Sequence, residues 1–366
     1  MFSRWLQATA IALLLLAGSA LSAPIIPQDG WLRDIGTPDN WKIAVLSPLN
    51  HTENREAYSL TVDLLNRDLA EHNLDAVTSE QLRPILRRNR IRSTGQISVD
   101  DAKIISESGN ITTILIPSID FYNASTYNPE FGMSLRIVRP DRMQVIGAVS
   151  VSSTGLDHIR LFGVGKIEDI DSLIGFVVNK AVNDLLKQID RLSDQEILYS
   201  KTKRIAVLQF NNLSETRKAG SIIANWTISQ LIERGLVVIE PGAVAEIASI
   251  LGDLPVGGID QLRLKTIAWF YELDYIITGQ VDLLRMGRGN SKTATPRLEL
   301  SARLLEAETA RIAMTYHCEA SGDDGHIAFG MGKVRSAGGL LSKKLDNMLD
   351  EFKGTELRLT GTFDSK

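Results

Sequence analysis

The chain has very little cysteine. Cys318 is its one thiol, so no disulfide can form within the chain. No cysteine lies near the N-terminal apolar segment, so that junction offers no site for a lipid anchor. No His-x-x-x-His or paired-cysteine spacing occurs, so the sequence predicts no metal site, and it predicts no cofactor. A formal net charge of −4 argues against a global positive field that would recruit nucleic acid.

Long apolar runs are also missing beyond the first 22 residues. Residues 1–22 contain one positive charge, Arg4, then the short apolar run Ala8–Ala17, then small residues up to Ser22. This order is typical of a secretory signal peptide, and the run is too short to span a bilayer comfortably. Cleavage after Ser22 or after Ala23, or retention as an uncleaved anchor, remain alternatives. The sequence therefore predicts an exported, water-soluble protein in a bacterial periplasm, with association to the outer membrane left open.

Two stretches of the sequence occur twice at a long period. Lys42–Leu46 (KIAVL) matches Arg204–Leu208 (RIAVL) at an offset of 162 residues. Phe162–Lys166 (FGVGK) matches Phe329–Lys333 (FGMGK) at an offset of 167. Fixed-period similarity of this kind indicates an internal repeat. We therefore predict two related domains, 38–190 and 203–354, joined by a polar linker.

Each predicted domain has the same pattern of elements. An apolar strand is followed by a helix with apolar spacing of three and four residues, a short strand and two further helices. A buried strand, a hairpin and a closing helix complete the domain. The predicted fold class is α/β (α+β), with two tandem β-α-β-α-α-β-β-β-α domains, each a mixed sheet with packed helices.

Three segments of the second domain carry a family resemblance. They are the opening strand Ile205–Asn212, the buried strand region Leu273–Val281 and the hairpin Leu298–Thr309. Together they resemble the α/β domain shared by the curli-secretion (CsgG-like) family and the amino-terminal domain of TolB. The resemblance implies a function in the cell envelope: secretion through a pore, export of a surface polymer, or activation of cell-wall synthases. The chain departs from the family in lacking a lipid-attachment cysteine and in having two domains, which favours an assembly or scaffold protein over a pore.

The Phe-Gly-x-Gly-Lys segments are candidate anion sites. Glycine-rich backbone before a helix start can cradle an anion, although the spacing is not that of a Walker A loop. The alternative is a structural turn in which the glycines adopt unusual backbone angles. The candidate residues are Gly163, Gly165, Lys166, Gly330, Gly332 and Lys333.

Two aspartates and the thiol are candidates for chemistry. Asp120 and Asp282 are expected to end equivalent strands, where α/β sheets often bind ligands, but neither has a partner base in the sequence pattern. Cys318 lies on an expected strand and fits a buried structural thiol. No catalytic residue is therefore predicted.

One basic cluster and one aromatic loop are candidate partner contacts. Arg83, Arg87 and Arg88 belong to the basic cluster, which could also be a solvated helix end. Tyr122, Tyr127 and Phe131 belong to the aromatic loop, which could also be local packing.

The function expected from these patterns is non-enzymatic. We predict assembly or secretion of an envelope or surface structure through contacts with envelope proteins, including an outer-membrane complex, and we consider a homo-oligomer. The alternative is a ligand-binding or regulatory module for a cell-wall or surface polymer. An enzyme such as a hydrolase ranks third.

Overall fold

The computed structural model describes residues 41–52, 54–92, 95–158, 165–193, 203–251, 260–287, 295–325 and 332–353. One order of elements occurs in the first half of the chain and again in the second half. The first half contains β1 (Lys42–Val45), β2 (Leu49–Asn50), α2 (Arg55–Glu71), β3 (Asp75–Val77), α3 (Ser79–Arg88), α4 (Val99–Gly109), β4 (Thr113–Asn123), β5 (Glu130–Arg139), β6 (Gln144–Thr154) and α5 (Ile170–Ser193). The second half contains β7 (Arg204–Val207), β8 (Asn211–Asn212), α6 (Ala219–Glu233), β9 (Val237–Ile239), α7 (Pro241–Ile250), α8 (Gln261–Tyr271), β10 (Tyr275–Arg285), β11 (Arg297–Glu306), β12 (Ile312–Ser321) and α9 (Ala337–Lys353). The predicted α/β class is confirmed, and each half has the predicted order of elements apart from the additional two-residue strands β2 and β8.

Local sequence explains where several helices begin. Asn54 precedes α2 and its side chain accepts a hydrogen bond from the Ala57 amide. Thr78 and Gln81 form a reciprocal capping box at the start of α3. Such side chains satisfy amide groups that have no partner inside the helix, so they fix its first turn.

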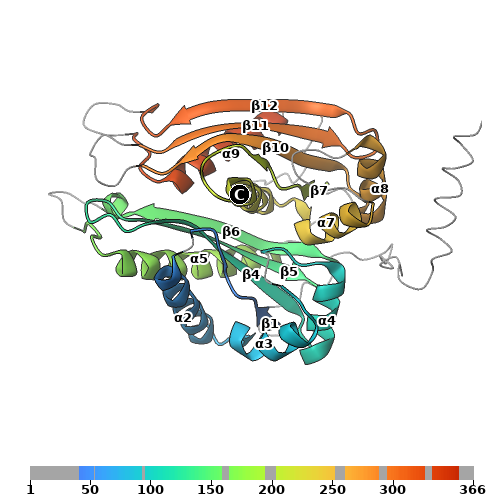
Figure 1. The fold of residues 1–366 in the computed structure, drawn as a ribbon, viewed down its shortest axis with the longest axis horizontal. Helices are drawn as coiled ribbons and strands as arrows, with labels where there is room; N and C mark the ends of the chain where they lie inside the picture. The colour runs from blue at the N-terminus through green and yellow to red at the C-terminus, as the bar shows by residue number, and fades with distance from the viewer. Residues whose placement is uncertain are drawn as a thin grey trace, which may run out of the picture. The chain divides into compact units, whose positions relative to one another are not determined.

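A single sheet of twelve strands runs through both halves (Figure 1). Its main path is β12-β11-β10-β7-β9-β6-β5-β4-β1-β3, with β2 and β8 paired to β4 and β10. The pairing within the first half is repeated within the second half. The halves join where β6 pairs antiparallel with β9, with Gln144 opposite Ile239 and Val145 opposite Val238. This pairing was not predicted, because β9 has only three residues and its partner strand belongs to the other half.

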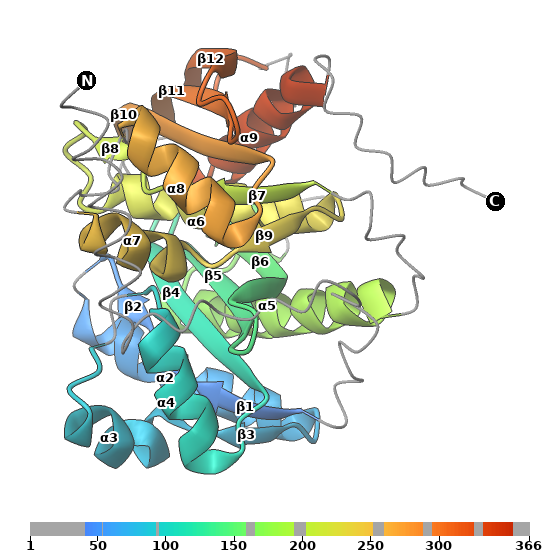
Figure 2. The same ribbon diagram turned by 90° about the vertical axis from the view of Figure 1, so that its right-hand side faces the viewer.

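Helices cover the sheet in layers (Figures 1 and 2). In the first half, α5 packs on β5, β6 and α2. On the other side of β6 lie α6 and α9, which also contact β10 and β11 respectively. The larger hydrophobic core includes residues from both halves, and a second core lies under α2 and α5. Alternate residues of β1 face the two cores: Ile43 and Val45 the second, Ala44 the larger.

The position of the two candidate aspartates differs from expectation. β4 continues past Asp120 to Asn123, and β10 continues past Asp282 to Arg285. Both aspartates sit where the strand register shifts, so each lies at a β-bulge rather than at a strand end. The strands continue because β5 and β11 keep pairing with them beyond the bulge.

In the part of the chain that the structure describes, we find no helix with both the length and the apolar character needed to cross a membrane. The predicted signal peptide, residues 1–22, lies outside the described residues.

Candidate functional site

The two halves meet at a buried ion pair. Nε of Arg136 on β5 lies 2.8 Å from Oε2 of Glu240, which directly precedes α7, and both side chains are almost fully buried. The Arg136 guanidinium also donates to Oδ1 of Asn225 on α6 at 2.8 Å and to the Gly95 carbonyl at 2.8 Å. A buried charge needs such complete pairing, because its desolvation is costly. Arg136 therefore ties both halves together at a fixed position.

A second buried cluster surrounds Asp120. Its carboxylate accepts hydrogen bonds from Ser118 at 2.8 Å, from Ser134, and from Nε1 of Trp226 on α6 at 2.9 Å. Burial raises the pKa of Asp120 to about 6, although these hydrogen bonds act in the opposite direction. The cluster contributes a second polar link between β4, β5 and α6.

His51 lies beside this cluster without the geometry of a catalytic base. Its Nε2 is 3.9 Å from Oδ1 of Asp120. Burial, followed by the nearby charge of Lys218, lowers the pKa of His51 to about 4, so the ring is neutral at pH 7. The hydroxyls of Ser118 and Ser134 donate to the carboxylate and not to the imidazole. A Ser-His-Asp mechanism needs the serine hydrogen-bonded to the histidine, and neither Ser118 nor Ser134 makes that hydrogen bond with His51 in this cluster.

Glu130 is the third buried acid at the contact between the halves. Its carboxylate accepts from the Ala337 amide at the start of α9 at 2.5 Å. Burial raises the pKa of Glu130 to about 8 and outweighs this hydrogen bond. The geometry of the three acids therefore supports a structural role in holding the halves together.

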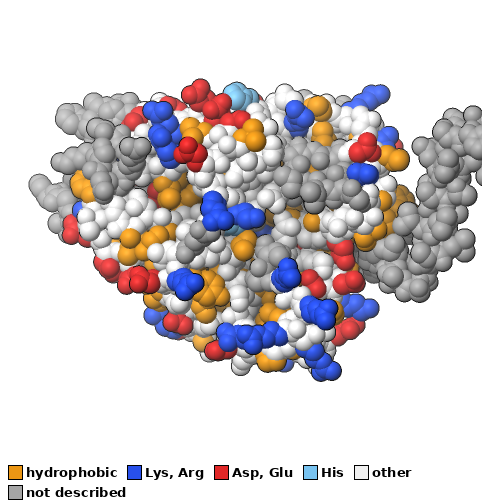
Figure 3. Space-filling view, viewed as in Figure 1, with side chains coloured by type: hydrophobic (Ala, Val, Ile, Leu, Met, Phe, Trp, Pro, Cys, Tyr) orange, Lys and Arg blue, Asp and Glu red, His pale blue; other side chains and the backbone are white. Residues whose placement is uncertain are grey.

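The structure places the predicted basic residues on α3. Arg83, Arg87 and Arg88 are exposed there, and Arg83 lies 3.9 Å from Glu80. Lys and Arg side chains gather at this edge of the molecule (Figure 3). None of the three arginines belongs to the buried ion-pair network, and their role as partner contacts stays a prediction.

The predicted aromatic residues lie at the β4–β5 hairpin and in its loop. Tyr122 and Phe131 are opposite each other across the two strands. The Phe131 ring is fully buried in the core under α2 and α5, and Tyr122 packs against that core. The ring of Tyr127 lies 5.3 Å from Nζ of Lys166. Phe131 thus has no surface to offer a partner in this structure, whereas Tyr122 is partly accessible.

The predicted anion sites are only partly described. Gly163 and Gly330 lie outside the described residues. Gly165 and Gly332 have positive φ angles of 96° and 79°, which explains the choice of glycine at these turns. Lys166 lies 2.9 Å from Glu168 and Lys333 lies 3.0 Å from Asp323, so both lysines have acidic neighbours.

The most exposed apolar side chains among the described residues do not belong to any predicted site. On α8, Leu262 and Trp269 are 64% and 75% exposed. They are seven residues apart, so they lie on the same face of the helix. The spacing was visible in the sequence, but the second face of α8, with Leu264, Ile267 and Ala268, is buried and resembles an ordinary core face. We call Leu262 and Trp269 the α8 apolar face.

Comparison with known proteins gives similarity of fold over part of the chain. No family model and no curated protein matches. The PelC dodecamer structure from Paraburkholderia phytofirmans is 16% identical, with a TM-score of 0.26, covering 40% of this chain and 87% of that one. Lipoprotein GNA1162 from Neisseria meningitidis is 14% identical, with a TM-score of 0.30, covering 42% and 99%. The C-terminal domain of LpoB from Escherichia coli is 12% identical, with a TM-score of 0.25, covering 37% and 93%.

Proposed function

We propose that this chain is a non-enzymatic periplasmic protein that acts in assembly or secretion of an envelope or surface structure through protein contacts. The observation that carries the proposal is the α8 apolar face. Trp269 is 75% exposed, on a helix whose opposite face is buried. Exposed tryptophan is uncommon on folded surfaces and is enriched at the centres of protein interfaces.

The rest of the molecule supports a rigid binding protein. The three buried acids are held by hydrogen bonds that link β strands to helices, and all three are shielded from water. These links hold α6, α7 and α9 against the sheet, and the Tyr271 hydroxyl of α8 donates to the Ala243 carbonyl of α7, which ties α8 to them. The predicted signal peptide supports work in the periplasm.

Cross-linking in living cells tests the proposal. A photoreactive amino acid at position 265, between Leu262 and Trp269, should capture an envelope protein. Trp269→Glu should abolish the adduct, because a carboxylate cannot be buried in an apolar contact. Ile312→Glu is the matched control, since Ile312 on β12 is 54% exposed and apolar but lies on another element. Equal capture by all three proteins would contradict the assignment of α8.

A separate experiment tests whether the protein is an enzyme that uses Asp120 and Asp282. Asp282, the counterpart of Asp120, is only partly buried and accepts a hydrogen bond from Gln280 at 2.7 Å. A substrate turnover that disappears in Asp120→Asn and Asp282→Asn proteins that still fold would overturn the non-enzymatic proposal.

The basic residues of α3 favour one second candidate, binding to an anionic cell-wall or surface polymer. Within the described residues, Arg87 and Arg88 make no ion pair, and both are exposed in the last turn of α3. Sedimentation with purified cell-wall polymer should then be lost in the double variant Arg87→Glu with Arg88→Glu. Unchanged sedimentation of that variant would remove this candidate.

A further inference from the structure

The strand β6 is only partly paired on the side that faces the second half. It has eleven residues, but β9 pairs only with Gln144 and Val145. The chain cannot continue β9 further along β6, because it turns at Gly235 (φ 73°) directly after α6. Beyond Gly147, this edge of β6 therefore has no neighbouring strand among the described residues.

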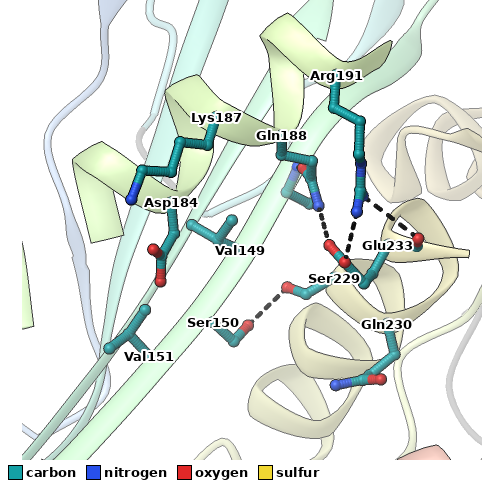
Figure 4. Close-up of a pocket in the computed structure, with 11 residues that line it drawn as sticks. Val149, Ser150, Val151, Asp184, Lys187, Gln188, Arg191, Ser229, Gln230 and Glu233 are labelled. Atoms are coloured by element: carbon teal, nitrogen blue, oxygen red, sulfur yellow. Dashed lines mark hydrogen bonds and ion pairs between the residues drawn. The ribbon is translucent and has the colours of Figure 1, made fainter. Parts of the chain in front are cut away.

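The unpaired edge forms the floor of a groove of about 400 Å³ (Figure 4). One wall is α5, with Asp184, Lys187, Gln188 and Arg191, and the other is α6, with Ser229, Gln230 and Glu233. The groove is closed near β9, where Gln188 and Arg191 both donate to Glu233. Its volume is at the lower end of the range for ligand pockets, about 300–1,000 Å³.

A side chain already occupies the place of a strand at one point. The Ala148 amide donates to Oε1 of Gln188 at 2.8 Å. This hydrogen bond shows that the Ala148 amide points away from β5, from the unpaired edge of β6 into the groove. In an antiparallel pair the direction of the backbone groups alternates, so the backbone of Ser150 faces the same way. No described residue accepts a hydrogen bond from the Ser150 amide.

We propose that this groove binds an extended peptide segment of a partner protein, which adds a short strand beside Ala148–Val151 of β6. A peptide strand would continue the β6–β9 pairing, since the groove occupies the next positions of the same ladder. Four residues of strand extend over about 13 Å, which suits a groove bounded by four β6 residues. The exposed Lys187 makes no ion pair within the described residues, so an acidic side chain in the peptide is favoured.

This inference rests on the proposed action through protein contacts, but it uses a different surface. The probes are decapeptides selected from a phage-displayed random library on the mature protein, with affinity measured by fluorescence anisotropy. We expect selected peptides to slow exchange of the Ser150 amide by about tenfold or more, because the new ladder protects this outward-facing group. Trp269→Glu should bind these peptides normally, so failure of the α8 proposal and failure of this one are distinguishable.

Two matched pairs of variants locate the site. Lys180 and Asp184 form an ion pair on α5, and only Asp184 lines the groove. Asp184→Trp should reduce affinity at least about tenfold by filling the groove, whereas Lys180→Trp breaks the same ion pair and should bind normally. Ser150→Pro removes the outward amide and should abolish binding, while Ser150→Ala keeps that amide and should retain it.

Several outcomes would overturn the proposal. They are the absence of any enriched peptide, equal binding by Asp184→Trp and Lys180→Trp, or exchange protection away from β6. Enrichment only after deletion of residues 355–366 would assign the groove to the chain's own C-terminal segment instead. Peptide binding that is retained in a folded Ser150→Pro protein would show that the peptide is held by side-chain contacts, which argues against strand addition.

Discussion

At the scale of single residues, the ion pair of Arg136 and Glu240 makes the strongest prediction. Removing one member leaves the other charge buried without its partner, which costs about 3–5 kcal/mol. Arg136→Ala should therefore lower the free energy of unfolding by about that amount. The double variant Arg136→Met with Glu240→Leu should lose less than Arg136→Ala alone, because no unpaired charge remains. Urea unfolding of the native protein and the two variants measures these free energies. A double variant that is less stable than Arg136→Ala would contradict the prediction.

Glu130 gives the molecule a predicted pH dependence. Its pKa is raised from 4.5 to about 8, so the folded state favours the protonated acid. The sign follows from linkage: this contribution is complete below about pH 4.5 and is lost as pH rises toward about 8. Each pKa unit corresponds to about 1.4 kcal/mol. Glu130→Gln keeps an acceptor for the Ala337 amide and stays neutral at every pH.

We therefore expect Glu130→Gln to raise the melting temperature by several degrees at pH 8.5 and to change it little at pH 5. Exposed Glu168 provides the control, because Glu168→Gln should have no such pH-dependent effect. Thermal unfolding followed by circular dichroism at the two pH values makes the comparison. An equal change in melting temperature at both values would show that Glu130 is ionised in the folded protein.

At the scale of elements, two glycines show how the second half is adapted to the first. A Cβ atom on Gly242 of α7 would collide with the carbonyl of Ile97. One on Gly338 of α9 would collide with Ser152 of β6 and the ring of Trp226. At the offsets of 162 and 167 residues, the corresponding positions of the first half are Glu80 and Asp171. Glycine therefore occurs in the second half, where α7 and α9 pack closely against the first half.

Alanine at these two positions should be destabilising. We expect Gly242→Ala and Gly338→Ala each to cost about 1–3 kcal/mol, typical of overpacking. Gly175 of α5 is the control, because a Cβ there meets nothing within 4 Å. Gly175→Ala should stabilise the protein by up to about 1 kcal/mol through helix propensity. Denaturant unfolding ranks the three variants, and a neutral Gly338→Ala would contradict the close approach.

Much of the element pattern could be read from the sequence because it depends on local periodicity. The apolar run of β4 and the apolar spacing of α2 are examples. The sequence could not show that α6 is buried on both sides, because its apolar residues are equally compatible with a helix that packs on one neighbouring layer or between two. The bulges at Asp120 and Asp282 also escaped prediction, because a bulge depends on the register of the neighbouring strand.

Candidate sites were harder to predict for the same reason. Arg136 and Glu240 are 104 residues apart, and neither belongs to a motif. The β6 groove lies along β6 beyond the end of β9, between α5 and α6. It depends on four elements from both halves of the chain, so no single segment of the sequence could predict it. By contrast, the exposed cluster of Arg83, Arg87 and Arg88 was visible because it lies within one helix.

At the scale of the whole molecule, the two ends of the sheet are β12 and β3. Pairing of β12 in one chain with β3 in the next would repeat the β6–β9 contact and build a head-to-tail assembly. The internal contact brings Gly338 against Ser152. By the same offset of 167 residues, the repeated contact would bring Asp171 against Glu319, two acids. Like charges facing each other disfavour such an assembly, as charged edges do in many sheet proteins.

We therefore expect any self-association of the mature chain to use a surface other than the β12 edge. Sedimentation velocity over a range of concentrations should give the same distribution for the native sequence and for Ile312→Glu, which adds a charge to that edge. A second variant, Trp269→Glu, reports on association through the α8 apolar face. An oligomer that dissociates in Ile312→Glu and persists in Trp269→Glu would show that the repeat does extend from chain to chain, against the charge argument.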